Sequence, residues 1–148
     1  MNKNNISETK KYISNSEIET ENIALDFANS LKSGDFIAFY GDLGSGKTAF
    51  VRGLAKNLCP KAKVSSPTFS IVNEYTGERL SIYHFDVYRI LDDDNLYSTG
   101  FYDYFDRPGV IVVEWSENIP FAIPEKRYDI IFEKISEEQR NITINKYD

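Results

Sequence analysis

The apolar residues near the start of the chain recur at the spacing of a helix that packs one face against a core. Ser16 is followed three residues later by Glu19, a pattern typical of a capping box at the start of a helix. Apolar side chains then follow at positions i, i+3, i+4 and i+7, namely Ala24, Phe27, Ala28 and Leu31. This spacing predicts a helix that begins after Ser16 and ends at Gly34.

Two further segments carry helical patterns, and one segment carries none. Val51, Leu54, Ala55 and Leu58 share one face and predict a helix that stops before Pro60. Asp92 to Asp94 leave two interpretations open: a short helix through Tyr97, favoured by acidic side chains at its positive end, or a solvated acidic loop. Residues 1–12 are polar and without periodicity, so we expect a loosely held tail.

Short apolar runs predict strands along the rest of the chain. Residues 36–40 (FIAFY) and 110–113 (VIVV) are wholly apolar, as is typical of strands buried on both faces. Further strands are predicted at 71–75, 80–86, 128–135 and 141–146, with Thr76-Gly77 as the turn of a hairpin. These elements predict a three-layer α/β fold with a mainly parallel central sheet and antiparallel edge strands.

The composition fits one folded domain over residues 13–148. Of 148 residues, 41% are hydrophobic and 27% are charged, which suffices to bury a single core. The one cysteine, Cys59, allows no internal disulfide, and we expect it to pack in the core. Because no signal peptide and no membrane-spanning run is evident, we expect a cytoplasmic protein that does not enter membranes. The net charge of −6 argues against direct, tight binding of nucleic acid.

A phosphate-binding motif lies between the 36–40 strand and the helix that follows it. Gly41, Gly46, Lys47 and Thr48 satisfy the pattern GxxxxGK[ST], whose glycines let backbone N–H groups curl around phosphate oxygens. Lys47 is expected to reach the β and γ phosphates, and the Thr48 hydroxyl to ligate magnesium. The strand–loop–helix context makes a chance glycine-rich turn a poor explanation. The sequence therefore predicts a Mg-nucleotide site.

Two carboxylates close apolar strands and are candidates to act beside this loop. Glu114 ends the run GVIVVE and Asp86 ends IYHFD, so both are expected at the carboxyl edge of the sheet, where ligands collect. Either could hold magnesium or orient an attacking water. The lone histidine, His84, excludes a histidine-based metal cluster, and we expect a satisfied residue on a half-buried strand, without a chemical role.

Several motifs together carry a family resemblance. GDLGSGKT, SSPTFSIVNEY, YHFDVYR, GFYDYF and VVEW occur in this order, and the chain resembles the TsaE (YjeE) family from its first helix to its final strands. The resemblance implies an ATPase that, with the TsaB and TsaD proteins, supports threonylcarbamoylation of adenosine 37 in tRNAs that read codons beginning with A. Contact with tRNA is then indirect, and turnover by the isolated chain is expected to be slow.

The resemblance also assigns roles to residues. By it, Lys47, Asp86 and Glu114 are the catalytic set, and Thr48 and Glu114 hold Mg²⁺. Ser66 to Phe69 match a segment that senses the γ-phosphate, with Thr68 as its polar contact. The residues it implies for binding ATP are Glu17, Gly44, Ser45, Gly46, Lys47, Thr48, Ala49, Thr68 and Glu117.

Three alternatives share the phosphate-binding motif. Residues 145–148 read NKxD and 106–109 read DxxG, as in GTPase switches, but the first ends the sequence and Asp106 precedes its strand instead of following one. A small-molecule kinase would need an arginine-rich lid, and no such segment is evident. A subunit that binds ATP without hydrolysing it uses the same motifs and stays open.

Overall fold

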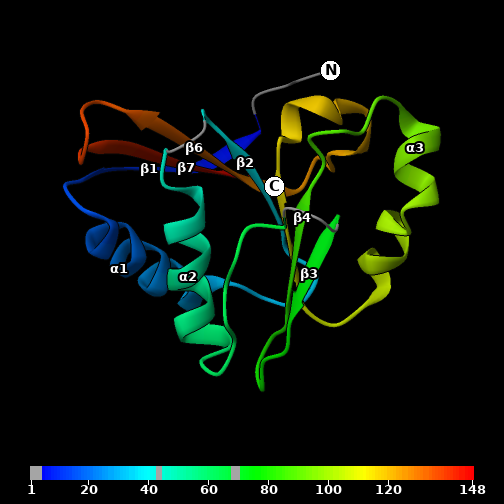
Figure 1. The fold of residues 1–148 in the computed structure, drawn as a ribbon, viewed down its shortest axis with the longest axis horizontal. Helices are drawn as coiled ribbons and strands as arrows, with labels where there is room; N and C mark the ends of the chain where they lie inside the picture. Colours follow the sequence, from blue (N-terminus) through cyan, green and yellow to red (C-terminus); the bar gives the residue numbers. More distant parts are fainter. Residues whose placement is uncertain (1–4, 43–44, 68–70) are drawn as a thin grey trace.

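The computed structural model describes residues 5–42, 45–67 and 71–148, and within them the chain alternates strands with helices (Figure 1). The strands are β1 (Ile6–Ser14), β2 (Phe36–Tyr40), β3 (Val72–Tyr75), β4 (Ile82–Asp86), β5 (Val110–Glu114), β6 (Arg127–Lys134) and β7 (Arg140–Tyr147). The α-helices are α1 (Glu17–Phe27), α2 (Lys47–Leu58) and α3 (Asp93–Ser98). Short 3₁₀ turns are η1 (Ala28–Ser30), η2 (Phe101–Asp106), η3 (Ser116–Asn118) and η4 (Pro120–Ala122).

The seven strands of the described residues form one mixed sheet in the order β1-β7-β6-β2-β5-β4-β3. The four inner strands β6, β2, β5 and β4 run parallel to one another. Antiparallel pairs lie at both edges, β3 with β4 on one side, and β6 with β7 and β7 with β1 on the other. The prediction of parallel central strands with antiparallel edge strands is therefore confirmed, although the antiparallel share is larger than expected, because the six pairings of the described strands divide evenly between the two kinds.

Helices cover both faces of this sheet. α1 and α2 lie together on one face, and α3 with η2 lies on the other (Figure 1). The first core contains Phe39, Phe50 and Leu54, and the second contains Phe85, Leu96 and Phe101, all fully buried. The inner strands β2 and β5 separate the two cores, which explains why their sequences are apolar throughout. None of the helices in the described part of the chain has the length and apolar character to cross a membrane.

The prediction of a loosely held tail over residues 1–12 was wrong from Ile6 onward. These residues form β1, which pairs antiparallel with β7 from Ile6 opposite Tyr147 to Ser14 opposite Arg140. Most β1 side chains are exposed. Backbone hydrogen bonds to the sheet edge stabilise the strand, and these leave no hydrophobic pattern in the sequence.

The first helix is also shorter than predicted. Ser16 caps it as expected, since its hydroxyl accepts a hydrogen bond from the Glu19 amide at 3.1 Å. The helix ends at Phe27 and tightens into η1, where the Leu31 amide donates to the Ala28 carbonyl. Ala28 and Leu31 are buried like helix residues, so the apolar spacing continues beyond the helix itself. At 93–98, the short helix is the interpretation that the structure confirms, with Asp92 as its cap.

Candidate functional site

The loop between β2 and α2 depends on glycine at both of its described ends. Gly41 has φ of +139°, and a Cβ atom on it would lie 2.5 Å from the carbonyl oxygen of Phe132 on β6. Gly46 has φ of +107° and is the N-cap of α2. Because Gly46 has no side chain, the first amides of α2 receive no side-chain cap. Uncapped amides at a helix N-terminus are donors available to an anion.

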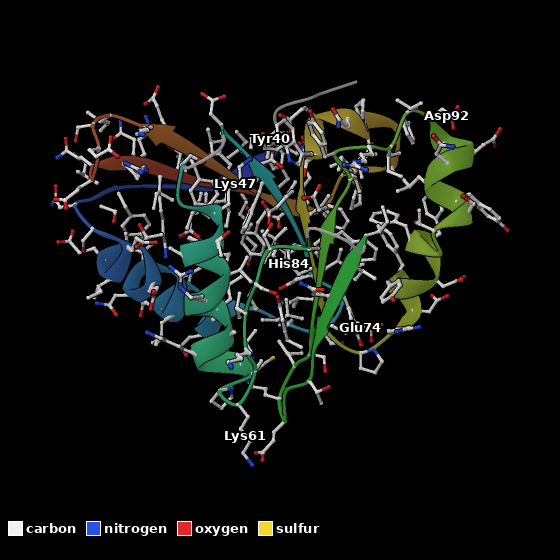
Figure 2. The ribbon with its side chains drawn as sticks, in the orientation of Figure 1. Tyr40, Lys47, Lys61, Glu74, His84 and Asp92 are labelled. Atoms are coloured by element: carbon white, nitrogen blue, oxygen red, sulfur yellow. The ribbon has the colours of Figure 1, made fainter. Side chains whose placement is uncertain are left out.

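Two polar side chains beside these amides also suit an anion. The Ser45 hydroxyl is buried, and within the described residues it has no hydrogen-bond partner. A buried hydroxyl without a partner is costly, so a ligand oxygen would satisfy it. Lys47 is only 6% exposed, and its Nζ lies 5.0 Å from the centroid of the Trp115 ring. Figure 2 labels Lys47 at the start of α2 and Tyr40 at the end of β2, the two elements that this loop connects.

These groups line a cleft of about 770 Å³. Of the residues predicted from sequence, it brings together Glu17, Ser45, Gly46, Lys47, Thr48, Ala49 and Glu114. Asp86 and Glu117 are not among its lining residues. Gly44 and Thr68 lie outside the described residues. The cleft therefore contains most of the described residues that the sequence predicted for the site, among them Glu114 at the end of β5.

The two strand-end carboxylates occupy different environments. Asp86 and Glu114 are register partners on neighbouring parallel strands, as their positions in the sequence predicted. Glu114 is 7% exposed and its Oε2 accepts a hydrogen bond from His84 Nε2 at 2.5 Å. Asp86 Oδ1 accepts from the Tyr88 amide at 2.9 Å and so holds the turn after β4. Burial, reinforced by the nearby Glu114, raises the pKa of the Asp86 carboxyl, and the Tyr88 amide opposes that rise.

The two remaining predicted carboxylates are both exposed. Glu17 is in the first turn of α1, where it lines the cleft and forms a 3.0 Å ion pair with Arg52 of α2. Its side chain is 81% exposed. Glu117 is in η3 and exposed, at the same edge of the sheet as Tyr40. Glu17 thus lines the cleft with an exposed side chain, whereas Glu117 is not among its lining residues.

The cleft also contains residues that the sequence analysis missed. They are Ser16, Ile18, Thr20, Asp42, Glu137, Glu138 and Arg140, whereas Ser66, which also lines the cleft, belongs to the segment that the sequence predicted to sense the γ-phosphate. Arg140 begins β7, and its Nη1 donates to the carbonyls of Ser136, Glu137 and Gln139, which orders the β6–β7 turn beside the cleft. No motif marked this turn, since its position follows from strand pairing rather than from local sequence.

His84 is the residue whose surroundings differ most from the prediction. The sequence predicted a histidine on a half-buried strand, but four of the five residues of β4 are buried and His84 is 0% exposed. It is satisfied as expected, yet its partner is Glu114, a lining residue of the cleft. The remaining side-chain prediction, that Cys59 packs in the core, is confirmed by its 1% exposure.

A magnesium ion fits the donors present. Among residues 5–42, 45–67 and 71–148, no three His, Cys, Asp or Glu side chains gather into a metal-binding group. Magnesium typically binds through one or two carboxylates together with substrate phosphates, for which Glu114 and the Thr48 hydroxyl are suitable in type and position.

The two sequence matches to GTPase motifs lack the structural context that such motifs require, because Asn145 and Lys146 are in β7 and Asp106 precedes β5.

Comparison with known proteins gives a consistent match over nearly the whole chain. Residues 14–142 match the family model of "Threonylcarbamoyl adenosine biosynthesis protein TsaE". The tRNA threonylcarbamoyladenosine biosynthesis protein TsaE of Bacillus subtilis is 39% identical over 134 residues, covering 88% of this chain and 84% of that protein. The Rickettsia typhi protein of the same name is 36% identical over 133 residues, covering 89% and 92%. The crystal structure of Bacillus subtilis YdiB matches with a TM-score of 0.80 and 34% identity, over 95% of this chain and 87% of that one.

Proposed function

Because the chain belongs to the TsaE family, we propose that it is a magnesium-dependent ATPase that supports threonylcarbamoyladenosine biosynthesis in tRNA. The observation that carries this proposal is the buried, unpartnered Ser45 hydroxyl beside the uncapped start of α2, in a cleft that Glu114 borders. These groups suit the phosphates of a nucleotide. The corresponding architecture is the three-layer fold of P-loop nucleotide-binding domains.

The residues that the sequence predicted as catalytic or metal-binding have separate roles in this proposal. Lys47 and the first amides of α2 neutralise charge that develops on the transferred phosphoryl group. Thr48 and Glu114 hold Mg²⁺, which when bound neutralises the phosphate oxygens. Asp86 or Glu114 orients the attacking water. Glu114 lines the cleft and Asp86 does not, which favours Glu114.

The working context of the protein is also part of the proposal. Relatives named for tRNA threonylcarbamoyladenosine biosynthesis support a place in that pathway. We propose TsaB and TsaD as partners, with tRNA reached through their complex, and the cytoplasm as the compartment. We expect slow turnover by the isolated chain, because an arginine that stabilises the transferring phosphate can be supplied by a partner protein.

The first test is phosphate release from Mg-ATP, with Mg-GTP as the nucleotide control, by the chain alone and with purified TsaB and TsaD. ATP-selective release that the partners stimulate is the expected result. Lys47→Ala should abolish ATP binding, and Lys61→Ala, which removes an exposed lysine outside the cleft, should not. A preference for GTP would contradict the proposal. ATP binding without release, with or without the partners, would favour the non-catalytic binding subunit.

The magnesium ligands need a separate test. Thr48→Ala and Glu114→Gln should each lower Mg-dependent turnover by about 10²-fold, since each removes a group that stabilises the transition state. Glutamine suits position 114 better than alanine because it leaves the buried His84 with a hydrogen-bond partner. Unchanged turnover in both variants would remove the assignment of the metal site.

A further inference from the structure

A row of polar side chains crosses three strands beneath the cleft. His84 on β4 is the register partner of Asn73 on β3 and of Val112 on β5. Tyr75 and Glu114 are two residues further along β3 and β5, so both are diagonal neighbours of His84 on the same face of the sheet. Figure 2 shows His84 in the interior of the molecule. Strand pairing therefore brings together three side chains that lie far apart in sequence.

Each nitrogen of the histidine ring has a polar neighbour. Its Nε2 donates to Glu114 Oε2 at 2.5 Å, and its Nδ1 lies 3.5 Å from the Tyr75 hydroxyl. His84 is fully buried, and Tyr75 is 6% exposed. A ring fixed in this way holds one oxygen of the Glu114 carboxylate and so limits the rotation of that side chain.

The Tyr75 hydroxyl also holds the chain segment on the other side of the row. It donates to the Ser65 carbonyl at 2.9 Å and accepts from the Ser65 amide at 3.2 Å. Asn73 Nδ2 donates to the same carbonyl at 3.0 Å. The next residue, Ser66, lines the cleft, as Glu114 does. One buried row thus supports two lining residues, one from a strand end and one from a loop.

We propose that His84 is a positioning residue that orients Glu114 for the metal–nucleotide complex and, through Tyr75, couples it to residues 65–66. The proposal rests on the proposed nucleotide site, but His84 and Tyr75, which carry it, do not line that site. Ligand-orienting partners of this kind typically change metal affinity by 10–100-fold when removed. Movement of the carboxylate toward a bound metal would act on the histidine ring, and through Tyr75 on the backbone at Ser65.

Two substitutions of His84 differ in whether they keep a hydrogen-bond donor to Glu114. His84→Gln places an amide nitrogen near the position of Nε2 and keeps a donor to Glu114, whereas His84→Asn places one near Nδ1 and loses it. Calorimetric titration of Mn²⁺ into protein saturated with a non-hydrolysable ATP analogue gives the metal affinity without turnover. His84→Asn should weaken it by about 10-fold or more, and His84→Gln by no more than about threefold. Equal affinities in His84→Asn and wild type, or equal losses in both variants, would overturn the positioning role.

The coupling to residues 65–66 is tested by hydrogen exchange of the Ser65 amide. Tyr75→Phe removes the 2.9 Å hydrogen bond to the Ser65 carbonyl. Its matched control is Tyr83→Phe, which removes a 2.7 Å hydrogen bond to the Pro108 carbonyl, and the two tyrosines are similarly buried. The Mn-nucleotide complex should slow exchange at Ser65 in wild type and in Tyr83→Phe, but not in Tyr75→Phe. If the Mn-nucleotide complex does not change exchange at Ser65 in wild type, the coupling is overturned. This test needs no His84 variant, so it remains decisive if His84→Asn does not fold. Wild type that binds no nucleotide would instead overturn the proposed function.

Discussion

Single residues show why the same backbone conformation can have different costs. Gly41 and Gly34 both have positive φ, at +139° and +93°. A Cβ atom on Gly34 would have no neighbouring atom within 4 Å, whereas one on Gly41 would lie 2.5 Å from the Phe132 carbonyl oxygen. The glycine of the phosphate-binding motif is thus required by packing against β6 as well as by its backbone angle.

Alanine substitutions at these two glycines should therefore separate strain from steric overlap. We expect Gly41→Ala to lower the free energy of unfolding by about 2–4 kcal/mol, from both causes, and Gly34→Ala by about 1 kcal/mol, from strain alone. Urea unfolding followed by circular dichroism measures both. Equal losses in the two variants would contradict the role of the Phe132 contact.

Cys59 allows a test of core packing at a single atom. Its Sγ donates to the carbonyls of Tyr75 and Leu80 at 3.3 and 3.5 Å, and burial raises the pKa of the thiol to about 11. Because the thiolate is the reactive form, native protein at pH 8 should not react with a disulfide reagent, while protein unfolded in urea should react fully. Rapid reaction of the native protein would show that this part of the core opens.

Residue by residue, the sequence predicted several residues that line the cleft but not the contacts between them. Lys47, Thr48 and Glu114 could be found because a motif or an apolar strand marks them, and all three line the cleft. His84 could not be connected with Glu114 from sequence, because their contact depends on which strands are neighbours. Arg140 was missed for the same reason.

At the scale of elements, the pairing of α1 with α2 supports the side of the cleft that carries the phosphate-binding loop. A Cβ on Gly53 of α2 would lie 2.2 Å from the carbonyl oxygen of Glu21 on α1, so the helices are in close contact. The Glu21 carboxylate, 11% exposed, binds Arg52 at 3.1 Å and also Lys56. These contacts fix the first turn of α1, which lines the cleft.

The ion pairs of Glu21 should make this helix pair sensitive to acid. Burial would raise the pKa of Glu21, but hydrogen bonds from Lys56 and Arg52 outweigh it and hold the pKa below 4.5. A lowered carboxyl pKa contributes stability above the unfolded-state value, and this is lost as pH falls through the folded-state value. Glu21→Gln should cost about 1–2 kcal/mol at pH 7, and this difference from wild type should shrink below about pH 4.5. Urea unfolding at several pH values tests this, with the exposed Glu78→Gln as control; a cost independent of pH would contradict it.

Elements with an apolar pattern were predictable, and an element without one was not. β2 and β5 are buried on both faces, and α2 shows one buried face, so their residue types alone identified them. β1 is held by backbone pairing and has exposed side chains, so its residue types resemble those of a loop. The antiparallel share of the sheet was underestimated for the same reason, because the unpredicted strand β1 adds an antiparallel pair.

At the scale of the whole molecule, the net charge of −6 bears on whether the isolated chain can bind tRNA. Binding to a phosphate backbone draws on clustered Lys and Arg and releases counterions. We expect the isolated chain to show no retention of tRNA in filter binding at low salt and micromolar protein, and the mixture with TsaB and TsaD to show it. Tight, salt-sensitive binding by the chain alone would contradict this expectation.

The position of β1 has a consequence for how the chain matures on the ribosome. β1 is made early, but its neighbour in the sheet is β7, which is made last among the described strands. Residues 6–14 therefore leave the exit tunnel long before β7 has been made, and in the nascent chain they lack the strand with which they pair in the fold. Charged side chains such as Glu8, Lys10 and Lys11 hinder an open strand from pairing with other chains. The polar residues that leave β1 without a hydrophobic pattern therefore also reduce aggregation of the nascent chain during synthesis.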